Sequence, residues 1–99
     1  MKLIYVCHPY GGKPENVELC KGIVMKLQDK HPQDVFISGI SAIPGDYSKV
    51  EYSVGLARCL ELLSRCDVII PAGEWKNSKG CLAEVAFAIK SGIEIKEEE

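Results

Sequence analysis

Short apolar runs alternate with longer segments of helical periodicity, and this alternation constrains the fold more than any other feature of the chain. The apolar runs are Leu3–Cys7, Val35–Ile37, 67–71 and 93–95. Between them, the spacing of apolar residues predicts helices over 14–30, 50–65 and 80–90. Right-handed βαβ units build a parallel sheet from such a pattern. The sequence therefore predicts an α/β fold, three-layered and flavodoxin- or Rossmann-like, with about four short parallel strands and helices on both faces.

The length of the chain, 99 residues, is enough for one hydrophobic core, so we expect a single domain over residues 1–99. A net charge of −2 with scattered Lys and Arg argues against a nucleic-acid polymer as partner, because binding to a phosphate backbone needs a concentrated basic face. No apolar stretch approaches the ~20 residues of a membrane span. We therefore expect a cytoplasmic protein with no membrane partner.

The chain has an unusually large number of cysteines for its length: Cys7, Cys20, Cys59, Cys66 and Cys81. Their number is odd, their neighbours are apolar and no C-x-x-C pair occurs, which favours buried, reduced thiols over disulfides. No His, Asp and Glu cluster has ligand spacing, so we expect no metal and no cofactor. Cys81 lies at a predicted helix start, where the pKa of a thiol falls, and thiol reactivity there is a minor hypothesis.

A ligand of such a sheet binds at the carboxyl ends of the strands, near the point where the strand order reverses. Three segments follow predicted strands and are expected there: 8–13, 38–48 and 72–84. The segment 38–48 contains two Gly and one Pro and has no periodicity, so it is predicted to be a long loop. Any chemistry is expected in these three segments.

Glu84 is the charged residue of greatest interest, because it follows the polar loop 72–79 by only a few residues and has apolar neighbours on both sides. We expect the nearby helix N-terminus to help keep its carboxylate ionised. An ionised carboxylate in a cleft at the strand ends is what a glycosidic nucleophile requires. The alternative is an ordinary glutamate near a helix start that points to solvent.

The turn after the first strand allows two interpretations. Gly11 and Gly12 permit close approach of a backbone to a ligand, or simply form a turn. Tyr5 either presents its hydroxyl to the cleft or is a core aromatic. His8 is either a structural residue or a catalytic one. A dinucleotide fingerprint, G-x-G-x-x-G, is absent from the sequence.

Residues 4–12 (IYVCHPYGG), 66–70 (CDVII) and 78–88 (SKGCLAEVAFA) together resemble the nucleoside 2-deoxyribosyltransferase superfamily, in particular its 2′-deoxynucleoside 5′-phosphate N-hydrolases. The resemblance extends over nearly the whole chain. It implies cleavage of an N-glycosidic bond, or deoxyribosyl transfer, on a small-molecule nucleoside or nucleotide. It also implies a homodimer or a larger homo-oligomer.

Carried over by position, the resemblance implies that Glu84 is the nucleophile that attacks C1′ of deoxyribose. Tyr5 is implied to orient the nucleophile and the sugar, and Ser78 to hold a 5′-phosphate. Gly11 and Gly12 shape the pocket, and His8 narrows it where the family has a small residue. The expected substrate-binding residues are thus Ser78, Gly80, His8, Gly11, Gly12 and Asp46.

A second position departs from the family, besides His8: an aspartate of the second long helix is replaced here by Cys59. A thiol cannot substitute for a carboxylate that holds sugar hydroxyls or protonates a leaving base. Asp46 and Glu61 are candidates for a second acid, and Trp75 is a candidate for base stacking or for an interface.

Three classes of function stay open: an N-glycosidic enzyme, a non-catalytic nucleotide-binding protein, and a scaffold without a ligand.

Overall fold

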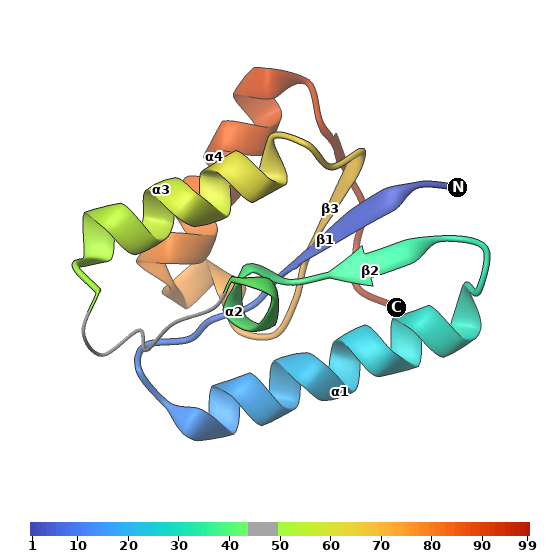
Figure 1. The fold of residues 1–99 in the computed structure, drawn as a ribbon, viewed down its shortest axis with the longest axis horizontal. Coiled ribbons are helices and arrows are strands. Elements are labelled where there is room, and N and C mark those ends of the chain that lie inside the picture. Colours follow the sequence, from blue (N-terminus) through green and yellow to red (C-terminus); the bar gives the residue numbers. More distant parts are fainter. Residues whose placement is uncertain (44–49) are drawn as a thin grey trace.

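The computed structural model describes residues 1–43 and 50–99, and it confirms the predicted α/β fold (Figure 1). Its described residues form one sheet of four parallel strands in the order β2-β1-β3-β4. The strands are β1 (Leu3–Cys7), β2 (Val35–Ile37), β3 (Val68–Pro71) and β4 (Glu94–Ile95). This order places the reversal point between β1 and β3, where the sequence analysis expects a ligand site.

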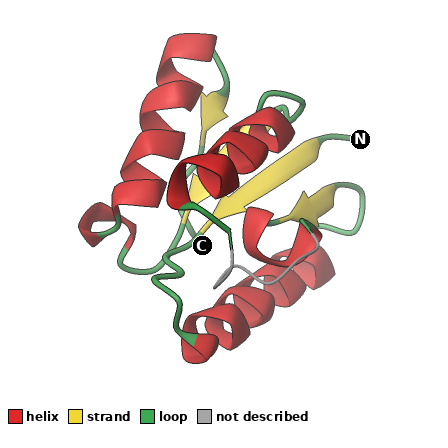
Figure 2. Cartoon of the chain, turned by 60° about the vertical axis from the view of Figure 1, so that its left-hand side comes forward, coloured by secondary structure: helices red, strands yellow, loops and turns green. Residues whose placement is uncertain are grey.

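Helices cover both faces of the sheet (Figure 2). They are α1 (Pro14–Lys30), α2 (Gly39–Ala42), α3 (Tyr52–Leu63) and α4 (Lys79–Ser91), with a 3₁₀ turn, η2 (Trp75–Asn77). The three long helices begin and end within two residues of their predicted limits, a difference of the size expected at helix ends. Within the ranges 1–43 and 50–99, none of the helices has the length and apolarity needed to cross a membrane.

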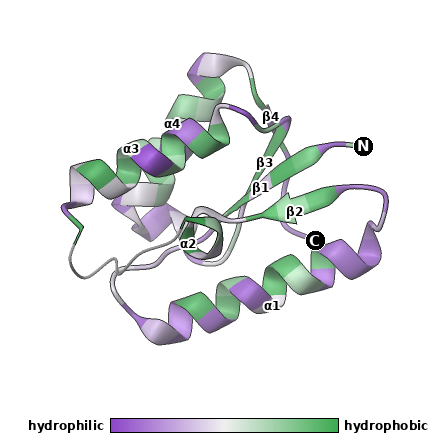
Figure 3. Ribbon diagram, viewed as in Figure 1, coloured by the Kyte–Doolittle hydropathy of each residue, from purple (hydrophilic) through white to green (hydrophobic). Residues whose placement is uncertain are grey.

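Strand β1 lies in the middle of the core and sends alternate side chains to opposite faces. Ile4 and Val6 pack with Leu27 of α1, whereas Tyr5 and Cys7 pack with Val85 of α4. Both sets are almost fully buried, and each large apolar side chain buried in this way contributes roughly 1.5–3 kcal/mol. This two-sided burial explains the unbroken apolar runs in the sequence, which are visible as hydrophobic strands in Figure 3.

The prediction of one long loop over 38–48 is wrong at its beginning, where α2 forms. Ser38 caps this short helix, because its Oγ accepts a hydrogen bond from the Ser41 amide at 3.4 Å and lies 2.8 Å from the Ser41 hydroxyl oxygen. The capping serine is therefore the sequence feature that indicates a short helix here, although the segment lacks helical periodicity. The later part of the segment, including Asp46, lies outside the described residues.

Gly39, the first residue of α2, lies directly against the central strand. A Cβ atom at this position would clash with the Tyr5 hydroxyl and would lie 2.8 Å from the Cys59 Sγ. The Tyr5 side chain does not yield easily, because it is 1% exposed and is packed in the core. A glycine at position 39 therefore lets α2 approach β1 and α3 at the carboxyl end of the sheet.

Substitution of Gly39 tests this close packing. Gly39→Ala is expected to lower the free energy of unfolding by about 1–3 kcal/mol, because the added methyl group overpacks a filled space. The matched control is Gly22→Ala on the exposed side of α1, where nothing lies within 4 Å of the new Cβ. There we expect a gain of up to about 1 kcal/mol from helix propensity. Urea unfolding measures the free energy of unfolding of both variants. If Gly39→Ala gains as much stability as Gly22→Ala, the close packing at Gly39 is contradicted.

Candidate functional site

A cleft of about 600 Å³ opens at the carboxyl ends of β1 and β3. Four segments form its walls: the turn after β1, the start of α2, the inner side of α3 and the first turns of α4. Three of these segments were expected at the cleft from the strand order of a parallel sheet. The α3 wall was expected only through the family resemblance, which implies a site residue at position 59.

The structure brings the sequence-predicted site residues together around this cleft, apart from Asp46, which is not among the described residues. Those that line it are Tyr5, His8, Gly11, Gly12, Ser78, Gly80 and Glu84. The other second-acid candidate, Glu61, lies on the exposed side of α3, where its carboxylate pairs with Arg65 at 3.4 Å. Glu61 therefore does not belong to the cleft.

Glu84 is a buried carboxylate, with only 8% of the residue exposed. Its Oε1 lies 3.7 Å from the Cys7 Sγ. Burial raises the pKa of Glu84, and the nearby Tyr5 hydroxyl and Cys7 thiol lower it again in part. Tyr5 is close enough to affect the pKa, yet Oε2 has no hydrogen bond of normal geometry anywhere in the described part of the chain. This oxygen is thus buried without a hydrogen-bond partner among the described residues.

The expected help of the helix terminus in keeping Glu84 ionised is outweighed by burial, which raises the pKa of this carboxyl group. Glu84 follows the capping residue Ser78 by six positions, which places it in the second turn of α4. The influence of the helix dipole fades beyond the first turn. Loss of hydration is therefore the dominant effect on this carboxylate.

Tyr5 belongs both to the core and to the cleft. Its ring is packed in the cluster between the sheet and α4, and its hydroxyl reaches the Glu84 carboxylate and the Cys59 thiol. Burial, and then the charge of Glu84, raises the pKa of this phenol far above its usual value. The hydroxyl therefore keeps its proton and is available to donate a hydrogen bond.

Cys59 and Gly55 form the inner face of the α3 wall. They are at positions i and i+4 and so share one side of the helix. This spacing of small residues was visible in the sequence, and the family resemblance indicated a site residue on this helix, at position 59. The structure thus places a thiol beside the Tyr5 hydroxyl, where the family resemblance implies an acid.

The first turn of α4 provides the polar end of the cleft. Ser78 caps the helix, and its Oγ accepts a hydrogen bond from the Cys81 amide at 3.2 Å. The residues Lys79 and Gly80 follow it along the cleft wall. A helix N-terminus next to a lysine favours an anionic group, because the peptide dipoles and the side chain both carry positive charge there.

The turn after β1 forms the opposite side of the cleft. Gly11 and Gly12 have φ values of 58° and 73°, a conformation that other residues rarely adopt. The space where their side chains would lie is open. His8 is 9% exposed, and its Nδ1 is 2.8 Å from the Pro9 carbonyl oxygen, an arrangement in which Nδ1 is the donor. Its ring rests against Gly73, which limits how far it reaches into the cleft.

Trp75 does not line the cleft. It is half-buried and packs against the core cluster between the sheet and α4. The Lys76 Nζ lies 5.7 Å from the centre of its ring. The candidate role of Trp75 in base stacking in the cleft is therefore not supported, because the 3₁₀ turn η2 folds this side chain back onto the protein.

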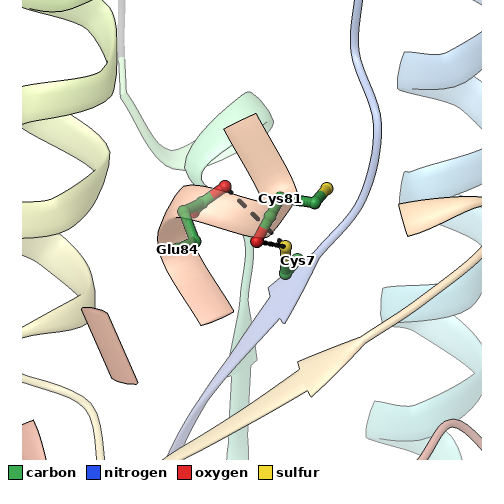
Figure 4. Close-up of side chains that lie close together, drawn as sticks. All are labelled: Cys7, Cys81 and Glu84. Atoms are coloured by element: carbon green, nitrogen blue, oxygen red, sulfur yellow. Dashed lines mark hydrogen bonds between the residues drawn. The ribbon is translucent and has the colours of Figure 1, made fainter. Parts of the chain in front are cut away.

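Three potential metal ligands lie close together (Figure 4): Cys7 at the end of β1, and Cys81 and Glu84 from α4. Their ligand atoms all lie within 4.8 Å of one another, and all three residues are buried. A hydrogen bond from the Cys7 thiol is the largest cause that lowers the pKa of Cys81. The expected direction for Cys81 is thus confirmed, but its main cause is the neighbouring thiol.

No family model and no curated protein matches the sequence. Solved structures do match. A 2-desoxiribosyltransferase from Leishmania mexicana is 21% identical, with a TM-score of 0.68 over 98% of this chain and 63% of the other. A conserved protein from Enterococcus faecalis V583 is 18% identical, with a TM-score of 0.75 over 98% of this chain and 62% of the other.

The likeness is one of fold. It agrees with the fold that the sequence resemblance implied, and it reaches the whole length of the described chain. The chain spans a little under two thirds of each matched protein. The activity and the substrate must therefore be inferred from the residues of this chain, of which Glu84 is the most informative.

The burial of Glu84 predicts a pH-dependent stability. Because its pKa is raised in the folded state, its contribution to stability is complete below the usual value of 4.5 and is lost as pH rises through the folded pKa. Glu84→Gln removes the buried charge and should raise the free energy of unfolding at pH 8 by about 1–2 kcal/mol. At pH 4 the two proteins should be nearly equal.

Urea unfolding at the two pH values measures this difference, with Glu97→Gln in the exposed C-terminal segment as the control. The control is expected to change the stability little at either pH. A Glu84→Gln variant that is less stable than the parent at pH 8 would contradict the assignment of an uncompensated buried carboxylate.

Proposed function

We propose that the protein cleaves the N-glycosidic bond of a 2′-deoxynucleoside or its 5′-monophosphate, with Glu84 as the nucleophile. The observation that carries the proposal is the buried Glu84 carboxylate, which lines the cleft and keeps Oε2 without a hydrogen bond among the described residues. A carboxylate with an unused lone pair in a cleft at the strand ends suits attack on an anomeric carbon. The sequence resemblance and the fold likeness support the same reaction class.

In this mechanism a Glu84 oxygen forms a bond to C1′ while the bond from C1′ to the base nitrogen breaks. The base leaves with the bonding electron pair and takes a proton from water or from a neighbouring acid. Water then attacks C1′ of the sugar ester and releases the carboxylate, which completes hydrolysis. Attack by a second base in place of water gives deoxyribosyl transfer instead.

Tyr5 acts as the positioning residue for the nucleophile. Its protonated hydroxyl lies beside the Glu84 carboxylate and the Cys59 thiol, and its ring is fixed by the core. A hydrogen bond donated by this hydroxyl holds the carboxylate toward the cleft and favours its ionised form. The ionised form is the one that can attack.

The two ends of the cleft suit the two ends of a nucleotide. Ser78, Lys79 and Gly80 at the N-terminus of α4 provide the side that favours a 5′-phosphate. Gly11 and Gly12 leave open space for the base or the sugar on the opposite side. A cleft of about 600 Å³ lies within the ordinary range for small-molecule sites.

A second candidate function is nucleotide binding without turnover, and Cys59 is the observation that favours it. This thiol lies beside the Tyr5 hydroxyl at the position where the family resemblance implies a carboxylate. Without that acid, the site retains its binding surfaces but has weaker assistance for the departure of the base. The homodimer implied by the resemblance stays a prediction in either case.

The proposed reaction is tested with the four 2′-deoxynucleoside 5′-monophosphates and with the free deoxynucleosides, following released base by chromatography. Glu84→Gln should lose base release by a factor of at least about 1,000, because no other group replaces the nucleophile. The variant should still show a ligand-dependent rise in melting temperature. Glu61→Gln, which changes a carboxylate outside the cleft, should keep the parent rate.

Each result distinguishes among the candidates. Equal base release by the parent and Glu84→Gln would contradict the proposed mechanism. A ligand-dependent melting shift without any release would establish the binding protein instead. If none of these nucleosides or nucleotides gives base release or a melting shift, the third class, a scaffold without a ligand, is the one that remains.

The pH dependence of the reaction gives a separate test of the roles of Glu84 and Tyr5. Because the nucleophile must be ionised and burial raises its pKa, kcat/KM should rise with pH through an apparent pKa above 4.5. Tyr5→Phe removes a hydrogen bond that lowers this pKa, so its acid limb should lie at a higher pH still. A rate that is already maximal at pH 4.5 in the parent, or an unshifted limb in Tyr5→Phe, would contradict these roles.

A further inference from the structure

We propose that Cys7, Cys81 and Glu84 form a binding site for a thiophilic divalent cation such as Zn²⁺. The site lies directly below the cleft and shares Glu84 with it. Occupation of the site by a metal ion makes the protein responsive to zinc. The binding of the ion follows from the cluster itself and does not depend on the proposed function.

The spacing of the three ligand atoms suits a tetrahedral ion. With Zn–S bonds of roughly 2.3 Å and Zn–O bonds of roughly 2.0 Å, tetrahedral geometry puts sulfur and oxygen about 3.5 Å apart and two sulfurs about 3.8 Å apart. The Cys7 Sγ and the Glu84 Oε1 are 3.7 Å apart, and all three ligand atoms lie within 4.8 Å of one another. An adjustment of about 1 Å at most brings the set to coordination geometry.

The hydrogen bonds of the cluster leave one of its buried polar atoms without a partner in the described part of the chain. Glu84 is 8% exposed, and its Oε2 has no partner in the described part of the chain. The Cys7 Sγ lies 3.7 Å from the Glu84 Oε1 and 3.9 Å from the Cys81 carbonyl oxygen (Figure 4). Buried polar atoms left in this state indicate a missing partner, and a cation would supply it.

The fold holds the three ligands on rigid elements. Cys7 ends the central strand, and Cys81 and Glu84 are at positions i and i+3 on one side of α4. The Ser78 cap fixes the first turn of that helix. Cys81 and Glu84 also line the cleft, so an ion reaches the cluster from there and a cleft water can provide a fourth ligand.

The chemistry of the donors selects the ion. Two thiolates favour Zn²⁺, and Co²⁺ as its spectroscopic substitute, over Mg²⁺ and Ca²⁺, which prefer oxygen ligands. Binding releases the two thiol protons to solvent, together with the Glu84 proton where that group is protonated. The affinity should therefore increase with pH.

Metal binding has a functional consequence, which rests on the proposed function. A Glu84 oxygen bound to the ion no longer has its lone pair free for attack on C1′, and the ion itself fills the space below the sugar. Zn²⁺ should then inhibit base release, and a chelator should restore it.

The binding test uses the reduced protein, titrated with Co²⁺ and then with Zn²⁺. We expect one Co²⁺ per chain with a thiolate charge-transfer absorption band, displacement by Zn²⁺, and a higher melting temperature with Zn²⁺ than with Mg²⁺. Cys7→Ser, Cys81→Ser and Glu84→Gln should each weaken binding at least about 10-fold, because each removes one ligand. Cys66→Ser is the matched control, since the Cys66 thiol contacts the Leu62 carbonyl oxygen outside the cluster.

The absence of a thiolate band, or unchanged binding in folded Cys81→Ser, would overturn the inference. If Cys7→Ser fails to fold, Cys81→Ser and Glu84→Gln decide the matter, because both lie at the cleft surface of α4. Metal binding in a protein that releases no base refutes the proposed function alone. Base release in a protein that binds no Zn²⁺ refutes this inference alone.

Discussion

The site depends on one side chain, Tyr5, which extends from the core of the sheet to the cleft. Its ring is buried on the central strand, so its hydroxyl has little freedom to move. Three helices meet at that hydroxyl: α2 at Gly39, α3 at Cys59 and α4 at Glu84. Glycine is needed at the first of these contacts because any side chain would displace the phenol. The packing of the core thus determines where the groups of the cleft lie.

The burial of Glu84 in the site lowers the stability of the folded protein. A carboxylate removed from water, with one oxygen lacking a hydrogen bond among residues 1–43 and 50–99, disfavours the folded state at neutral pH. Proteins retain groups of this kind where function requires them. The same under-bonded carboxylate underlies both proposals, as the proposed nucleophile toward an anomeric carbon and the proposed ligand of a cation. Cys7 and Cys81 add the soft donors that the second role needs.

Much of the fold could be predicted from the sequence, because the apolar runs and helical spacings are local patterns that burial enforces. The location of the cleft followed from strand order, which placed Ser78 and Glu84 on the same side of the sheet as Gly11. The features of the site that could not be predicted from the sequence depend on contacts between residues that are far apart in the chain. Cys7 and Cys81 are 74 positions apart, so no spacing rule marks their cluster. The raised pKa of Glu84 follows from tertiary burial, which an argument from the helix terminus does not measure.

The most direct test of the central claim is mass spectrometry of the protein quenched during reaction with a 2′-deoxynucleoside 5′-monophosphate. The account predicts that a 5-phospho-2-deoxyribosyl group is joined through C1′ to the Glu84 carboxylate, so that the peptide containing Glu84 gains its mass. This adduct should be absent in Glu84→Gln. A slow alternative acceptor or a low quench temperature favours its accumulation. Base release without an ester on any peptide, or with the ester on a residue other than Glu84, would contradict the claim that this buried carboxylate is the nucleophile.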